Sequence, residues 1–185
     1  KGNYDVLLHS TKDYIVGPSR VWFPNCYDHV RIWPMPIQID KIYDVGFCGN
    51  VVNRQAWLQF VDQNFKLKQD IFVIGRKMVD AINSYKIHFN KNIANDINYR
   101  VFETCGCSTA LVTSYNPQMI ELGFIDGRNC MMYNNFSELK EKTQILLDND
   151  AYREQVAKSG FELVITKHTY VERTKQLLEL YNECT

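Results

Sequence analysis

The sequence lacks an excess of charge of either sign, and it lacks any long hydrophobic run. Its 21 Lys and Arg residues balance 21 Asp and Glu residues, so the formal net charge is zero. We therefore expect no broad surface for nucleic acid or an anionic membrane, and any anion site must be local. No stretch approaches the ~20 apolar residues that a membrane span requires, and no signal-peptide pattern opens the chain.

The sequence also lacks the pattern of a metal site. Cys105 and Cys107 are too closely spaced for a zinc knuckle, and no second cysteine pair or nearby histidine completes a ligand set. We expect no metal there. Four of the six cysteines lie inside apolar runs that are typical of buried strands and helices. We interpret them as free thiols of a protein in a reducing compartment, the cytoplasm.

Hydrophobic residues make up 45% of the 185 residues, which is enough to bury the core of one domain or slightly more. From Tyr43 to Tyr133, short apolar runs alternate with segments of helical spacing. The pattern predicts strands at 43–48, 70–74, 86–89, 109–113 and 130–133, and helices at 54–65, 78–83 and 99–107. Strands that are apolar on both faces indicate an α/β fold with a parallel sheet flanked by helices. Such sheets bind ligands beyond the carboxyl ends of their strands.

The regions on either side of this alternation have other patterns. Residues 4–9 predict a buried strand and residues 21–24 a second short one. Two prolines in 33–36 prevent regular structure, so this segment is the candidate linker. Because a strand begins so close to Lys1, we expect the chain to be a piece of a longer polypeptide.

The last third of the chain is predicted to be helical. One helix covers 136–147 with Ser137 as its cap, and Asp150 caps the next. A final helix begins at 168–170. It carries apolar side chains on one face, at Leu177, Leu178 and Tyr181.

Two strand ends carry residues suited to phosphate. Gly49 and Asn50 follow one strand and precede a helix, where the backbone can approach a phosphate and the helix start offers N–H groups. Arg54, in the first turn of that helix, has a guanidinium fork that matches phosphate oxygens. Arg76 and Lys77 follow the next strand, at the same edge of the sheet. A tight turn and solvated surface cations remain alternative interpretations.

A third candidate is the Asn-rich loop 90–98, which leads into the helix that starts at Tyr99. Loop amides and a helix N-terminus form an anion cradle. Arg100 and Glu103 occupy the first turn, where a carboxylate can accept hydrogen bonds from a ribose diol. Glu103 has an alternative interpretation as an acid that complements the helix dipole.

Residues 98–113, NYRVFETCGCSTALVT, resemble the donor-site helix and following strand of group 1 (GT-B) glycosyltransferases. The likeness is to the subgroup related to spore-maturation glycosyltransferases, which carry an N-x-R-x-F-E-x-x-A-C-G segment. It continues from the strand at 43–50 to the ending His168-Thr169-Tyr170 with Arg173. The resemblance implies the C-terminal half of a GT-B enzyme. Its parts would be a remnant of the N-terminal acceptor domain and linker at 1–36, a Rossmann-like donor domain at 37–167, and a C-terminal helix at 168–185 that packs back across the domain boundary.

The resemblance also implies an activity, which is metal-independent transfer of a glycosyl group from a UDP- or GDP-sugar to an acceptor hydroxyl, with no cofactor. Glu103 matches the second glutamate of a pair separated by seven residues, which binds the donor ribose in relatives. The first glutamate falls at Asn95, beside Asp96. The donor-binding residues are then expected to be Gly49, Asn50, Arg54, Arg76, Asn98, Tyr99, Arg100 and Glu103.

No catalytic residue is assigned, because in this architecture the general base usually comes from the N-terminal domain, which is largely missing. The isolated chain is expected to bind donor with little or no turnover. Three alternatives stay open. They are a non-catalytic nucleotide- or glycan-binding relative, which Asn95 favours, a sugar-nucleotide epimerase, which the Arg-x-Phe-Glu segment fits less well, and a structural module that docks through Trp22, Trp33 and the last helix.

The four histidines have mostly structural interpretations. His9 and His29 lie in or near the presumed interdomain cleft, where acid or base chemistry is the alternative to a structural role. His88 fits a packed position in a strand. His168 is expected to fix the last helix.

Overall fold

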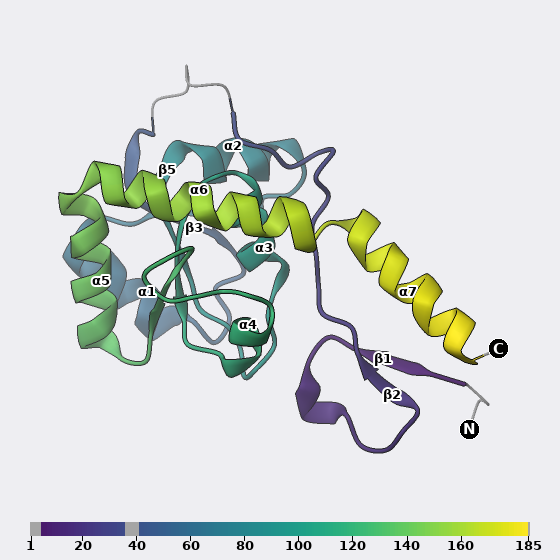
Figure 1. Ribbon diagram of the computed structural model, residues 1–185. Coiled ribbons are helices and arrows are strands. Elements are labelled where there is room, and N and C mark those ends of the chain that lie inside the picture. Colours follow the sequence, from purple (N-terminus) through teal and green to yellow (C-terminus); the bar gives the residue numbers. More distant parts are fainter. Residues whose placement is uncertain (1–4, 36–40, 185) are drawn as a thin grey trace.

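A five-stranded parallel sheet in the order β4-β3-β5-β6-β7 forms the centre of the molecule (Figure 1). The computed structural model describes residues 5–35 and 41–184, so Tyr4 of the predicted first strand and Pro36 of the predicted linker lie outside the described residues. All four strand pairings are parallel. The strands are β3 (Tyr43–Gly49), β4 (Lys68–Ile71), β5 (Tyr85–Asn90), β6 (Ala110–Ser114) and β7 (Met131–Tyr133).

Helices cover both faces of this sheet, and alternate side chains of the strands feed two separate cores. One core includes Cys48 and Leu111 and packs against α2 (Arg76–Ser84) and α3 (Tyr99–Gly106). The other core includes Phe47 and Val112. It packs against three helices, α1 (Gln55–Phe65), α5 (Phe136–Asp148) and the first half of α6 (Asp150–Lys167). The predicted α/β class and two-sided burial are confirmed, because neighbouring residues of one strand point to opposite faces.

One strand boundary was predicted wrongly. β4 spans residues 68–71 and not 70–74, because Phe72 takes a left-handed backbone conformation, with φ of +57°, and ends the strand. Phe72 and Ile74 are 75% and 78% exposed. These two apolar residues therefore lie in a surface loop before α2. Periodicity alone cannot distinguish such a loop from a strand.

The sequence also contains helix signals that were missed or misplaced. Asn135 caps α5 and Asn149 caps α6, each accepting a backbone N–H at 2.9 Å, so the predictions of Ser137 and Asp150 as caps were wrong. The short helix α4 (Pro117–Glu121) was not predicted, although Asn116 caps it and proline is its first residue. Asparagine caps as well as serine or aspartate because its side-chain oxygen reaches the same N–H groups.

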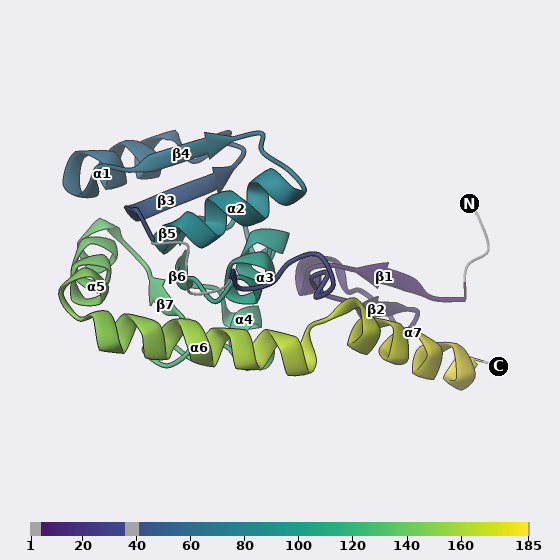
Figure 2. The same cartoon turned by 90° about the horizontal axis from the view of Figure 1, so that it is seen from above.

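The N-terminal segment forms a separate two-stranded parallel sheet of β1 (Leu7–His9) and β2 (Arg20–Trp22), with a 3-10 turn, η1 (Lys12–Tyr14), between them. Leu7 and Leu8 are exposed, so the prediction of a buried strand was wrong. An apolar run can predict a strand, but the strand is buried only where another apolar layer packs on it. The helix α7 (Tyr170–Cys184) lies beside these strands, as Figures 1 and 2 both show.

A compact junction ties residues 25–28 to the ends of α3 and α6. The Tyr27 backbone N–H donates to His168 O at 3.1 Å, and the Tyr170 N–H donates to Tyr27 O at 3.2 Å. The Tyr27 ring lies directly on Gly106, where an added Cβ would come within 2.5 Å of it. Only glycine permits this approach.

His168 joins the end of α6 to α4 and α7. Its Nε2 donates to Leu122 O at 2.8 Å, and its Nδ1 accepts from Arg173 Nη2 at 3.1 Å. Burial lowers the His168 pKa to about 4, so the ring is neutral near pH 7. These contacts agree with the predicted structural role.

Five cysteines, at 26, 48, 105, 107 and 130, are buried and free. Among the described residues, none of the helices is both long and apolar enough to cross a membrane.

Candidate functional site

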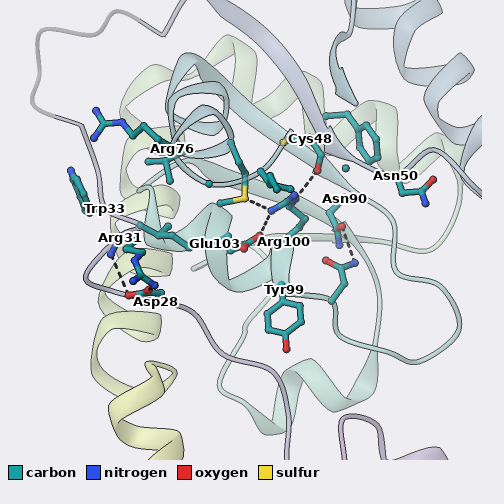
Figure 3. A pocket seen from close by; sticks show the side chains of 18 of the residues that line it. Asp28, Arg31, Trp33, Cys48, Asn50, Arg76, Asn90, Tyr99, Arg100 and Glu103 are labelled. Atoms are coloured by element: carbon teal, nitrogen blue, oxygen red, sulfur yellow. Dashed lines mark hydrogen bonds and ion pairs between the residues drawn. The ribbon is translucent and has the colours of Figure 1, made fainter. Parts of the chain in front are cut away.

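A cavity of about 640 Å³ opens at the carboxyl ends of β3 and β5, between the N-termini of α2 and α3 (Figure 3). The structure places all eight predicted donor-binding residues around it, namely Gly49, Asn50, Arg54, Arg76, Asn98, Tyr99, Arg100 and Glu103. Lys77, the other cation predicted beside Arg76, does not line the cavity. The parallel sheet explains the convergence, because the loops after all its strands meet at one edge.

Arg54 is held at the end of β3 as an unpaired cation. It lies one residue before α1, and not in the first turn as predicted. Its Nε donates to Lys91 O at 2.8 Å and its Nη1 to Asn50 O at 2.9 Å. No carboxylate among the described residues forms an ion pair with Arg54. Burial lowers the Arg54 pKa but leaves the guanidinium charged at neutral pH.

The start of α2 forms a second wall of the cavity. Gly75 has φ of +60° and ψ of −139°, a conformation that residues with a Cβ rarely adopt. Gly75 and the start of α2 line the cavity, and the first N–H groups of an α-helix have no acceptor within the helix. Arg76 lies at the rim, where its Nε donates to Asp80 at 2.8 Å and its guanidinium lies 5.6 Å from the centre of the Trp33 ring.

The N-terminus of α3 forms the third wall, and its cap residue faces away from the helix. Asn98 makes no side-chain cap hydrogen bond. Its Nδ2 donates instead to the side-chain oxygens of Asn90 and Asn92, at 3.1 and 3.0 Å. The first amides of α3 therefore lack a side-chain cap from Asn98, which leaves the positive end of the helix dipole available to an anion.

Arg100 and Glu103 form an ion pair across one turn of α3. Arg100 also reaches out of its helix, donating from Nε to Cys48 O at 2.8 Å and from Nη2 to Val73 O at 3.4 Å. Burial raises the Glu103 pKa, while the charge and hydrogen bond of Arg100 oppose that rise. The pairing was not predicted, although the i,i+3 spacing of an arginine and a glutamate is a signal for it.

His88 lies beneath this wall of the cavity and is packed, as predicted. The Cys48 N–H donates to His88 Nε2 at 3.0 Å, and Thr104 bonds the other ring nitrogen. Burial, and then the charge of Arg100, lower the His88 pKa to about 3. A neutral imidazole thus holds the end of β3 against α3.

Asn95 and Asp96 lie outside the cavity. Asn95 Nδ2 donates to Asp13 at 3.3 Å, and Asp96 accepts from the Ser10 hydroxyl at 3.2 Å. Both side chains thus face the β1–β2 segment. Neither His9 nor His29 lines the cavity.

The sequence pattern did not predict the part of the cavity wall formed by Asp28 and residues 31–33. Asp28 accepts from Arg31 Nη1 at 3.1 Å, and Trp33 lies beside Arg76 (Figure 3). The prolines indicated only an irregular segment, and no local pattern shows where such a segment packs. Among residues 5–35 and 41–184, no group of three or more His, Cys, Asp or Glu side chains is placed to hold a metal ion.

A family model described as "Glycosyl transferase-like" matches residues 38–179, which is most of the chain. The chain belongs to the glycosyl transferase-like family. A comparison with curated protein sequences finds no match.

Solved structures show that this glycosyl transferase-like chain has the fold of a GT-B C-terminal domain. The C-terminal domain of the group 1 glycosyl transferase LpcC from Francisella tularensis superposes with a TM-score of 0.63 at 12% identity, covering 77% of this chain and 98% of that one. HepE from Anabaena, in complex with UDP-glucose, has a TM-score of 0.75 at 11% identity, covering 97% and 64%. Sucrose-phosphate synthase from Thermosynechococcus elongatus has a TM-score of 0.68 at 10% identity, covering 90% and 53%. The chain thus spans between about half and two-thirds of the length of the last two proteins.

Proposed function

We propose that this chain is the donor-binding domain of a glycosyltransferase and binds a nucleotide-diphosphate sugar in the cavity. The observation that carries the proposal is the convergence of eight residues, chosen from sequence alone, on one cavity at the carboxyl edge of the sheet. The HepE structure contains UDP-glucose. This supports a UDP-sugar as the first donor to test and a GDP-sugar as the second.

The groups around the cavity suggest how such a donor would lie. The diphosphate would sit near Gly49, Asn50 and Arg54, because the cavity there is lined by this cation without a carboxylate partner and by the open start of α3. Glu103 would accept hydrogen bonds from the ribose hydroxyls. Tyr99, which is half exposed, and Asn98 would border the donor from the same helix start.

The proposed chemistry is departure of the nucleoside diphosphate from the anomeric carbon. Fixed positive groups and a helix N-terminus stabilise the negative charge that develops on the leaving group, without need of a divalent metal. The acceptor hydroxyl needs a general base. We assign that base to an N-terminal domain outside this chain, with residues 1–36 as its remnant and linker, residues 37–167 as the donor domain, and 168–185 as the helix that returns across the boundary. The chain alone is then expected to bind donor with little turnover.

A second candidate is a relative that binds a nucleotide or glycan without transferring it. The departure at Asn95 favours this alternative, because the side chain there is an exposed amide bonded to Asp13 and does not line the cavity. Transfer activity after the upstream domain is restored would distinguish the two. We further propose membership in the spore-maturation-related subgroup, on the basis of residues 98–107, and a reducing, cytoplasmic location, on the basis of the five free cysteines.

Calorimetric titration of the chain with UDP, UDP-glucose, GDP and a GDP-sugar tests donor binding. Glu103→Ala is expected to weaken nucleotide binding by roughly 10-fold or more, because a hydrogen bond to a charged group contributes about 1.5–3 kcal/mol. Glu154→Ala, which removes an exposed carboxylate from α6, is the matched control. Absence of binding by the folded chain, even with the upstream domain restored, would exclude the transferase interpretation.

A further inference from the structure

The guanidinium of Arg100 has almost no hydrogen-bonding capacity left for a ligand. Nε donates to Cys48 O at 2.8 Å, Nη1 contacts Glu103 Oε2 and Met78 Sδ, and Nη2 donates to Val73 O at 3.4 Å. A guanidinium has five N–H groups, so at most one remains unused. The acceptors belong to four segments around the cavity, namely the end of β3, the loop before α2, α2 itself and α3.

Glu103 has the opposite character. Arg100 occupies its Oε2, but no group among the described residues hydrogen-bonds its Oε1, and the residue lines the cavity (Figure 3). Its side chain is only 14% exposed, and that of Arg100 is 20% exposed. Burial favours the neutral form of a carboxyl group in this position unless a cation lies beside it.

We propose that Arg100 is a positioning residue, which keeps Glu103 ionised and directs one carboxylate oxygen into the cavity, and that it does not itself bind the donor's phosphates. The ligand role of Glu103 rests on the proposed function, whereas the state of its carboxyl group does not. Arg54 differs from Arg100, because it has no carboxylate partner among the described residues and remains the cation for the diphosphate.

Several other titratable groups lie near Glu103, and burial keeps His88 and Cys48 neutral between about pH 5 and pH 8. Burial lowers the pKa of His88 to about 3 and raises that of Cys48 to about 11. Burial also raises the pKa of Cys107 and of Tyr170. The remaining charged groups of the cavity are Asp28, Arg31, Arg54 and Arg76. Since Asp28 is the other carboxylate there, Asp28→Asn serves as a control for any pH effect.

The ligand-free test is an NMR titration of the Glu103 side-chain carboxyl carbon in the 185-residue chain. Glu103→Gln assigns the signal. In Arg100→Met the pKa of Glu103 is expected to rise by about one to three units, because an opposite charge at this range lowers a carboxyl pKa by that amount. An unchanged pKa in a folded Arg100→Met variant would overturn the proposal whether or not any nucleotide binds.

The ligand test compares uridine, which has no phosphate, with UDP, and guanosine with GDP in parallel. If Arg100 acts through Glu103, Arg100→Met weakens nucleoside and nucleotide by the same factor, roughly 10-fold at pH 6, and both affinities recover as the pH rises and Glu103 ionises. A larger loss for UDP than for uridine would identify Arg100 as a phosphate ligand and overturn the proposal.

The remaining outcomes also separate the two proposals. A wild-type chain that binds none of the four compounds contradicts the proposed function, while the carboxyl titration still decides the role of Arg100. If Arg100→Met does not fold, Arg100→Lys keeps the charge but loses the fork that reaches Cys48 O and Val73 O. Uridine affinity should then fall, and unchanged affinity for uridine and UDP would count against the proposal.

Discussion

Two regions of the molecule each place a neutral, buried histidine near an arginine, yet the arginines have different partners. At the cavity, the charge of Arg100 acts on His88 and pairs with the carboxylate of Glu103. At the junction, Arg173 donates to Gln176 at 2.7 Å, to Asn25 O at 3.3 Å and to His168 Nδ1 at 3.1 Å. Among the described residues, no carboxylate forms an ion pair with Arg173.

The difference separates a binding surface from a structural joint. At the junction, the acceptors of Arg173 are neutral groups from three segments, and the contacts hold α7 and residues 25–28 against the sheet domain. At the cavity, Glu103 Oε1 has no hydrogen-bond partner in the part of the chain that the structure describes. Because Glu103 lines the cavity, this oxygen can accept a hydrogen bond from a bound ligand.

The largest expected effect is on stability, and it follows from removing the Tyr27 side chain from the junction. Tyr27→Ala removes a ring that is 1% exposed and packs on Gly106, so it should lower the free energy of unfolding by about 3–5 kcal/mol. Urea unfolding measures the loss. Tyr14→Ala, at an exposed position, should change it little. A loss below about 1 kcal/mol for Tyr27→Ala would mean that this joint does not hold the segments together.

The two histidines should make stability depend on pH in the same direction. Both pKa values are lowered in the folded state, to about 3 and about 4, so the unfolded chain binds the protons first. The contribution of the two neutral histidines to the free energy of unfolding is then fully present above pH ~6.5, and it is lost as the pH falls toward 4. Each histidine should contribute a loss of about 2 kcal/mol between pH 7 and pH 5. His168→Gln and His88→Gln should each remove about half of this dependence, and an unaltered slope in either variant would contradict the assignment.

Gly75→Ala should have a smaller effect on stability and a specific one on binding. An added Cβ meets no atom within 4 Å, so the expected loss of about 1 kcal/mol comes from the backbone at φ of +60° alone. Gly17→Ala is the matched control, because Gly17 also has a positive φ and open surroundings but lies far from the cavity, between η1 and β2. Calorimetry should detect weaker UDP binding only in Gly75→Ala. Equal UDP binding by both variants would place the start of α2 outside the site.

The smallest expected effect is at Asn95. Asn95→Ala should leave UDP affinity within about twofold, because the side chain faces Asp13 and not the cavity. Asn95→Glu should cost about 0.5 kcal/mol of stability by placing two carboxylates together at the surface. A 10-fold weaker binding of UDP by Asn95→Ala would show that the ligand extends to the first-glutamate position.

Much of the fold could be predicted from local patterns. The strands β3, β5 and β6 are apolar on both faces and bounded by polar residues, so their positions follow from periodicity within one or two residues. The position of β4 was predicted wrongly because the apolar residues after Ile71 belong to a loop and not to the strand. The exposure of β1 was missed because alternation describes a strand but not what covers it.

The convergence of the candidate site was predictable, but its internal contacts were not. Residues at the carboxyl ends of parallel strands must share an edge, so Gly49, Arg54 and Glu103 could be grouped before their geometry was known. The wall formed by Trp33 depends on where an irregular segment packs. Sequence spacing carries no information about that.

The sequence by itself determined the alternation of strands and helices and the start of a helix at Tyr99 after a polar loop, since both depend on neighbours within one or two turns. Only the tertiary structure decided that Arg100 joins Cys48 and Val73 to Glu103, that Asn98 turns away from its helix, and that Asn95 lies outside the cavity. These outcomes depend on groups that are distant in sequence. Which acceptor a side chain reaches is set by the packing of whole elements.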